Sequence, residues 1–218
     1  MTDPIAPQPA PTEHVPQYAP PVQPQKKGVP LWVTLVIAAF LVVLVGGVVA
    51  AIVIPLVSGG SSVTEPAAPA EPETYTSTAY GFTVDLPGTP EEATTTQMLG
   101  GGLSAELTTA TLTSASGNYI VSAAKFPAEI SFEDQAIETT LDNSVTGMVG
   151  AITGAELESS ESIDLDGVPA RAGVISVAGQ PDQLFVVAFS DNIQYVLITS
   201  DVDDADHTAF VDSFAFGD

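Results

Sequence analysis

The sequence predicts an α+β fold, an antiparallel sheet with two packed helices, preceded by a single transmembrane helix and a disordered Pro-rich tail. An apolar run without a charged residue occupies 31–57, and short alternating patterns separated by turn residues fill 74–218. Two stretches within that second part have helical periodicity instead. The chain therefore divides into a tail (1–30), a transmembrane helix (31–57), a linker (58–73) and one acidic α+β domain (74–218).

The tail is expected to be disordered. Residues 1–30 contain nine prolines and no apolar periodicity, so they cannot bury enough apolar surface to offset their chain entropy. Such a tail is either a docking strip for a domain with an aromatic groove or a solvated spacer. The spacer is favoured, because basic residues do not flank each PxxP segment.

The apolar run predicts a membrane span and its orientation. As a helix, residues 31–54 rise ~1.5 Å each and exceed the ~30 Å hydrocarbon core of a bilayer. Lys26 and Lys27 precede the run, so the N-terminus is expected in the cytoplasm and the acidic domain outside, with Trp32 as an interfacial anchor. A cleaved signal peptide would have a shorter apolar core. We therefore expect an uncleaved signal anchor in the plasma membrane.

The bilayer is the expected partner of residues 31–57, and a second copy of the span is a weaker candidate. Gly46 and Ala50, and likewise Gly47 and Ala51, form pairs of small residues four positions apart. Such pairs can let two helices approach closely, although glycine and alanine are common in membrane helices generally.

Charge is concentrated beyond the span. Residues 58–218 carry 25 acidic residues against Lys125 and Arg171, which accounts for the whole formal charge of −23. This balance argues against binding to nucleic acids or to anionic lipid headgroups, and solubility is its simplest explanation. The linker, 58–73, changes from Gly/Ser-rich to Pro/Ala/Glu-rich, so it is expected to be flexible and then extended. The chain has no cysteine, which excludes disulfides and Cys-ligated zinc.

The first half of the domain is predicted to form strands. Phe82, Val84 and Leu86 alternate with polar residues, as in a half-buried strand, and a turn follows up to Pro90. Residues 91–98 are Thr-rich and expected to be exposed. The triple glycine after them is interpreted as a hairpin loop, since no Gly-Lys-Ser/Thr follows that would make it a phosphate-binding loop. The strands are expected at 82–86, 103–114 and 119–126.

A helix is expected next. Four apolar residues recur at helical spacing and form one stripe, which we expect to face the core. They are Ile137, Leu141, Val145 and Met148. Ser131 is the expected N-cap, with Asp134 completing an approximate capping box, and Gly150 is expected to end the helix.

The remainder returns to strands and ends in a second helix. Asp166–Gly167 is the strongest hairpin signal in the chain, and Asp191–Asn192 predicts another turn. The strands are expected at 156–165, 168–177, 184–189 and 193–199. Asp203 or Asp204 is the expected cap of the last helix. One face of this helix is expected to carry His207, Phe210, Val211 and Phe214.

Three motifs of this domain resemble the PsbP-like fold. They are the opening strand and turn Gly81–Pro90, the hairpin Asp166–Ala170, and the closing Phe210-x-x-Ser213-Phe214. That α/β sandwich is shared by a photosystem II extrinsic protein, a Ran-binding import factor and bacterial surface lipoproteins. The resemblance implies a binding or assembly module of the same fold, and it transfers no functional residue.

The domain shows no catalytic constellation. His207 is its one histidine, and neither a Gly-x-Ser-x-Gly elbow nor an H-E-x-x-H motif occurs. One acidic cluster consists of Asp201, Asp203, Asp204 and Asp206. A calcium loop would require an acid at its fifth position, where Ala205 stands, so helix capping is favoured and calcium is the alternative. No cofactor is expected.

Together these features predict a bitopic protein of a bacterial plasma membrane. Its domain outside the cell is expected to be a non-catalytic binding or assembly module, with a protein or a cell-envelope ligand as partner. The alternative is a membrane-tethered enzyme, such as a cation-assisted hydrolase.

Overall fold

The computed structural model describes residues 72–100, 102–130, 132 and 137–217. The predicted tail, the predicted transmembrane helix and all but the last two residues of the predicted linker lie outside this part, so the expectations for them stay predictions. No helix within the described part is long and apolar enough to cross a membrane.

Most of the described chain forms one antiparallel sheet of seven strands, in the order β3-β4-β5-β9-β8-β7-β6. Along the chain, the strands are β3 (Glu91–Gly100), β4 (Leu103–Ser114), β5 (Gly117–Lys125), β6 (Ala155–Leu165), β7 (Val168–Val177), β8 (Gln183–Ser190) and β9 (Ile193–Ser200). The four strands β6 to β9 follow one another as hairpins, and β9 then pairs with β5 in the centre. The predicted antiparallel sheet is confirmed.

A second, three-stranded sheet is built from the two ends of the domain. It consists of β1 (Glu73–Ser77), β2 (Phe82–Leu86) and β10 (Ala215–Phe216), with β2 in the middle. The alternation predicted for β2 is confirmed, because Phe82, Val84 and Leu86 are buried while the residues between them are partly exposed. The chain termini of the domain thus meet on one strand, which closes the fold.

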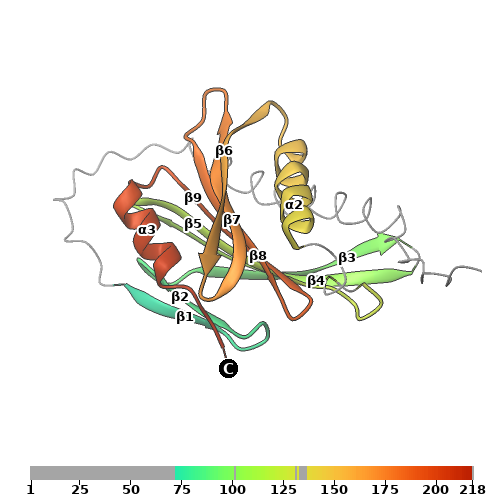
Figure 1. The fold of residues 1–218 in the computed structure, drawn as a ribbon. Coiled ribbons are helices and arrows are strands. Elements are labelled where there is room, and N and C mark those ends of the chain that lie inside the picture. Colours follow the sequence, from blue (N-terminus) through green and yellow to red (C-terminus); the bar gives the residue numbers. More distant parts are fainter. Residues whose placement is uncertain (1–71, 101, 131, 133–136, 218) are drawn as a thin grey trace, which may run out of the picture.

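The two helices of the described residues cover opposite faces of the large sheet, which gives a layered α+β fold (Figure 1). Helix α2 (Ile137–Ala151) packs over β6, β7 and β8. Its predicted apolar stripe is confirmed, since Leu141, Val145 and Met148 are buried in the core on that face and Ile137 is partly buried against it. Helix α3 (Asp204–Asp212) and the three-stranded sheet belong to the core on the other face, which α3 enters through Phe210.

The tight turns follow from the residues that occupy them. Asp166 and Gly167, between β6 and β7, both have positive φ, as do Asp191 and Asn192 between β8 and β9. Two-residue hairpin loops require this conformation, which glycine, asparagine and aspartate tolerate best. Both hairpin turns predicted from the sequence are confirmed.

Several boundaries differ from the prediction. Glu73, assigned to the linker, begins β1, and neither β1 nor the short β10 was predicted. Gly150 does not end α2, which runs to Ala151, and the positive φ falls on Gly154 instead. Phe214 is buried as expected, but it lies beyond α3, whose C-cap is Ser213. Local turns and caps need only short signals, whereas strands as short as β10 depend on a partner strand far away in the sequence.

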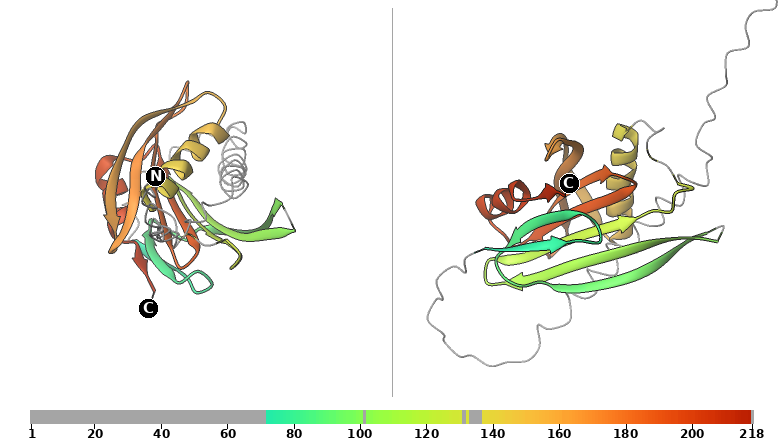
Figure 2. Two further views of the ribbon diagram at one scale, coloured as in Figure 1. Left: turned by 45° about the vertical axis from the view of Figure 1, so that its right-hand side comes forward. Right: turned by 90° about the horizontal axis from the view of Figure 1, so that it is seen from below.

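The β3–β4 hairpin projects beyond the rest of the sheet. Strand β4 pairs with β5 only from Glu106 onward, so Leu103, Ser104 and Ala105 pair with β3 alone. Figure 2 shows this hairpin extending away from the helices at its loop end. Residues 91–96 of β3 are exposed, as the sequence predicted for this Thr-rich stretch.

Candidate functional site

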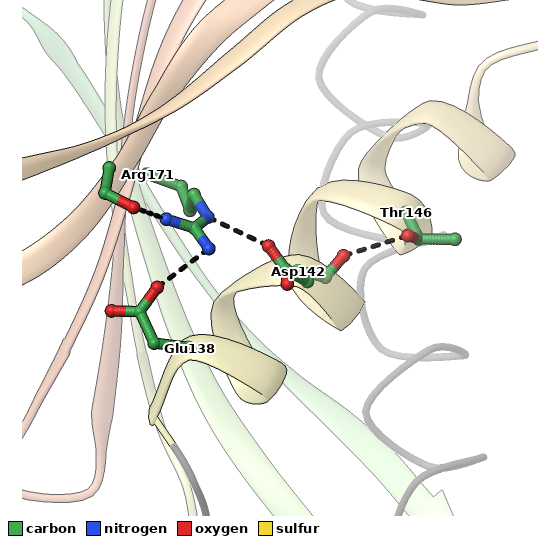
Figure 3. Close-up of polar contacts among 5 residues, drawn as sticks. Glu138, Asp142, Thr146 and Arg171 are labelled. Carbon is green, nitrogen blue, oxygen red and sulfur yellow. Dashed lines mark hydrogen bonds and ion pairs between the residues drawn. The ribbon is translucent and has the colours of Figure 1, made fainter.

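A polar cluster joins helix α2 to strand β7 through Arg171 (Figure 3). The Arg171 guanidinium lies 2.8 Å from a carboxylate oxygen of Glu138 and 2.8 Å from one of Asp142, and it also donates to the Ser162 hydroxyl. The Arg171 side chain is only 12% exposed, whereas the two carboxylates are 55% and 61% exposed. Ser162 lies directly opposite Arg171 in the β6–β7 ladder. The cluster therefore brings three elements together at one cation.

The interactions of this cluster stabilise the fold. Arg171 donates to three different side chains, two of which are carboxylates, so its positive charge is already balanced and its side chain is held in one orientation. The hydrogen bond to Asp142 raises the pKa of Arg171, with nearby Glu138 adding to the effect, so the guanidinium stays charged. A bound anion would have to displace these acids. The cluster therefore fixes α2 on the sheet, and nothing in its geometry prepares it to receive a ligand.

Replacing Arg171 with Met is expected to destabilise the domain by about 1–2 kcal/mol, because hydrogen bonds to charged groups are lost but the acids stay solvated. Lys125→Met is the matched control. It changes the net charge equally, but Lys125 is exposed and is in no ion pair found among the described residues. Urea unfolding of both variants measures the difference. Equal effects would mean that net charge, and not this bridge, accounts for the loss.

His207, the one histidine of the domain, is attached to the fold. Its Nδ1 lies 2.7 Å from the Thr199 hydroxyl oxygen, and Thr199 is completely buried. Burial lowers the pKa of His207, and nearby Asp204 opposes this shift only in part. The ring is therefore neutral at pH 7. Because its hydroxyl partner is inaccessible to a substrate, the His207–Thr199 pair does not form a nucleophile and base.

His207 is expected to make the domain less stable in mild acid. Its pKa in the folded state lies below the ordinary value of 6.5, so the unfolded chain takes up the proton first as the pH falls. Stability is therefore lost as the pH falls through 6.5 toward the folded-state pKa. The melting temperature should fall further between neutral and mildly acidic pH for the wild type than for His207→Gln, which keeps a polar partner for Thr199. Parallel pH profiles would contradict this assignment.

The acidic cluster after β9 is organised around the start of α3. Asp203 is the N-cap, and its Oδ1 accepts from the Asp206 backbone N–H at 2.8 Å. Asp204 and Asp206 lie in the first turn of α3, where negative side chains interact favourably with the positive end of the helix dipole. Asp201, in the segment before the helix, has a positive φ. The predicted helix cap is confirmed. In the described ranges, no group of three or more His, Cys, Asp or Glu side chains is arranged to hold a metal ion.

The residues predicted to set the membrane orientation and to allow self-association are not among those that the structure describes. Lys26, Lys27 and Trp32, and the small-residue pairs of the span, all lie outside the described residues. Their roles stay predictions from the sequence.

A buried polar contact between β9 and α2 was not predicted from the sequence. Gln194 of β9 is 1% exposed, and its Nε2 donates to the Ser144 hydroxyl of α2 at 3.3 Å. Its Oε1 is among the buried atoms without a hydrogen-bond partner. Gln194 is flanked by apolar strand residues, so the pattern alone predicted only a buried strand. The facing serine is 50 positions away, and only the fold brings the two together.

Negative charge is spread along the outer strand β6. Glu156, Glu158 and Glu161 are exposed there, and Glu158 accepts from the Ser176 hydroxyl at 2.6 Å. The opposite edge strand, β3, carries acids only at its first two positions. The two edges of one sheet thus differ in charge.

Comparisons with known proteins concern the fold. No family model matches the sequence, and no curated protein matches it. The solution structure of a cyanobacterial PsbP from Synechocystis sp. PCC 6803 is similar at 16% identity, covering 74% of this chain and 99% of that chain, with a TM-score of 0.45. A Pseudomonas aeruginosa protein of unknown function is similar at 12% identity, covering 64% of this chain and 88% of that chain, with a TM-score of 0.25. The first belongs to the family that the sequence resemblance indicated.

Proposed function

We propose that this chain is a bitopic plasma-membrane protein whose outer domain binds a partner or takes part in an assembly, without catalysing a reaction. The membrane part of the proposal rests on the uncharged run 31–57 and on Lys26 and Lys27 before it.

The proposal of a non-catalytic binding domain is supported by one observation: the side chains that could take part in catalysis are engaged in contacts that stabilise the fold. Arg171 joins α2 to the sheet, His207 is hydrogen-bonded to a buried threonine, and Asp203 caps α3. A catalytic group must instead be free to approach a substrate. In this domain these groups support the fold, and the exposed side chains of the outer strands remain for contact with a partner.

The charge of the domain indicates the chemistry of that partner. Residues 74–218 carry 22 acidic residues against Lys125 and Arg171, a formal charge of −20. Arg171 is already paired. The exposed surface is therefore strongly negative, and complementary potentials favour a partner with a basic surface, such as a basic protein or a cationic envelope component.

Protease treatment of intact cells tests the topology. The protease should remove the acidic domain and leave an epitope placed before Lys26 protected. Replacing Lys26 and Lys27 with Glu should weaken this orientation, because few other charges define it. Digestion of the epitope with survival of the domain would overturn the orientation.

Cross-linking in intact cells tests the binding role. The yield of cross-linked complexes between the tagged chain and its partner should decrease when Glu156 and Glu161 on β6 are both replaced by Gln. Replacing Glu129 with Gln and Asp212 with Asn is the matched control, since it removes two exposed acids from other places. Equal yields of cross-linked complexes for the wild type, the β6 variant and the control variant would contradict a charge-dependent role for this edge.

A further inference from the structure

The two edges of the seven-stranded sheet are protected to different degrees. At one edge, β6 carries exposed acids and a register shift between Leu157 and Ser159, both of which discourage pairing with another strand. At the other edge, β3 has Glu91 and Glu92 at its start and no charge from Ala93 to its end. Its own register shift lies only at the loop end, between Met98 and Gly100. The part of the β3 edge from Ala93 onward therefore lacks the charges that discourage pairing at β6.

Strand β3 also has the length and exposure needed for pairing. It has ten residues, and the side chains of Ala93, Thr94, Thr95 and Thr96 are exposed. Among the described residues, β4 is its sole strand neighbour. The main-chain groups on its outer side are therefore open to a further strand, and β-branched threonines favour extended pairing.

We propose that β3 pairs with β3 of a second copy of this chain, antiparallel and about a two-fold axis at Thr95. The axis places Thr95 opposite the same residue of the second copy, Thr94 opposite its Thr96, and Glu92 opposite its Met98. Two seven-stranded sheets then continue as one. This pairing goes beyond the proposed function and does not depend on which side of the membrane the domain faces.

The charge pattern of β3 is what fits a second copy. Both acids are at the beginning of the strand, so antiparallel pairing places each pair of acids against the uncharged end of the other copy. Like charges opposite each other would be unfavourable, and this arrangement avoids them. Met98, 64% exposed in the single chain, would be covered in part by the stem of Glu92. A copy approaching through β6 would instead bring glutamates together.

Single-cysteine cross-linking tests this pairing in the full chain, which has no cysteine of its own. Thr95→Cys is treated in membranes with a short bifunctional thiol reagent and should give a dimer at twice the 22.3 kDa mass of the chain. Ser160→Cys is the matched control, because Ser160 is also an exposed strand residue but lies on the other edge, β6. It reports random collisions and should give little dimer.

A charge variant separates pairing from collision. In Thr94→Cys/Thr95→Glu, glutamates would face each other across the axis, so cross-linking should fall below that of Thr94→Cys alone. Ser160→Glu in the Thr94→Cys background adds the same charge at the other edge and should leave cross-linking unchanged. Equal cross-linking at Thr95 and Ser160, or none at Thr95, would overturn the pairing. The same measurement on detergent-solubilised chain should agree, which distinguishes a failed pairing from a failed topology.

Discussion

Truncation of Phe214 to Ala is expected to destabilise the domain by about 4 kcal/mol, in the range typical of a buried phenylalanine. Phe214 is 3% exposed and lies just after α3. Its ring stacks on Phe82 at a centroid distance of 5.4 Å and meets Tyr195 and Phe216 edge to face at 5.8 Å and 5.0 Å. The substitution removes one ring from contacts with β2, β9 and β10.

The position of this ring explains why the effect should be large. Phe82 lies in the three-stranded sheet and Tyr195 in the seven-stranded sheet, so Phe214 fills the space between the two. Aromatic pairs in these geometries contribute beyond the apolar area that they bury. A cavity here would therefore loosen the contact between the sheets as well as the end of the chain.

Phe216→Ala is the control, because that ring is only partly buried and also contacts Tyr195. It should cost less than half as much. Urea denaturation of a fragment 72–218, which contains every residue of both core clusters, gives the two values. An effect of Phe214→Ala no larger than that of Phe216→Ala would mean that the sheets are held together elsewhere.

Gly117→Ala is expected to cost about 3 kcal/mol or more, through backbone strain and overpacking acting together. Gly117 begins β5 with a φ of +119°, a conformation that residues with a side chain rarely adopt. An added Cβ would also lie closer than 3.0 Å to the Asp201 carbonyl oxygen and to Val202 Cγ2. The backbone between β9 and α3 would have to move.

Gly167→Ala separates the two causes. Gly167 also has a positive φ, +83°, but no atom lies within 4 Å of the place that its Cβ would take. This variant should show the backbone term alone, ~1 kcal/mol for a residue placed in the left-handed region. If both variants lose the same stability, the close approach of Asp201 to Gly117 does not contribute. Melting of the same fragment measures both.

The two hairpin turns and the cap of α3 were predicted well because a few neighbouring residues determine them. Asp166–Gly167 and Asp191–Asn192 tolerate positive φ, and Asp203 has a side-chain oxygen that can reach an amide in the first turn of α3. Such preferences operate within three or four residues. These local preferences determine the structure wherever the rest of the fold is compatible with them.

The Arg171 cluster could be anticipated only in part. The sequence identifies Arg171 as one of the two basic residues of the acidic domain. It does not say which acids are its partners, since Asp142 is 29 positions away and on a different element. The packing of α2 across β7 decides this, because that packing places both helix carboxylates beside the guanidinium.

By itself, the sequence determined the α+β class of the domain, the strand hairpins, the buried stripe of α2 and the cap of α3, because alternation, helical spacing and turn residues are local properties. Only the tertiary structure decided the strand order, the second sheet and the two sheet edges. Pairing of Ala215 and Phe216 with β2 joins residues more than 130 positions apart. A two-residue strand has no periodicity of its own, so it forms only when the rest of the fold brings its partner alongside.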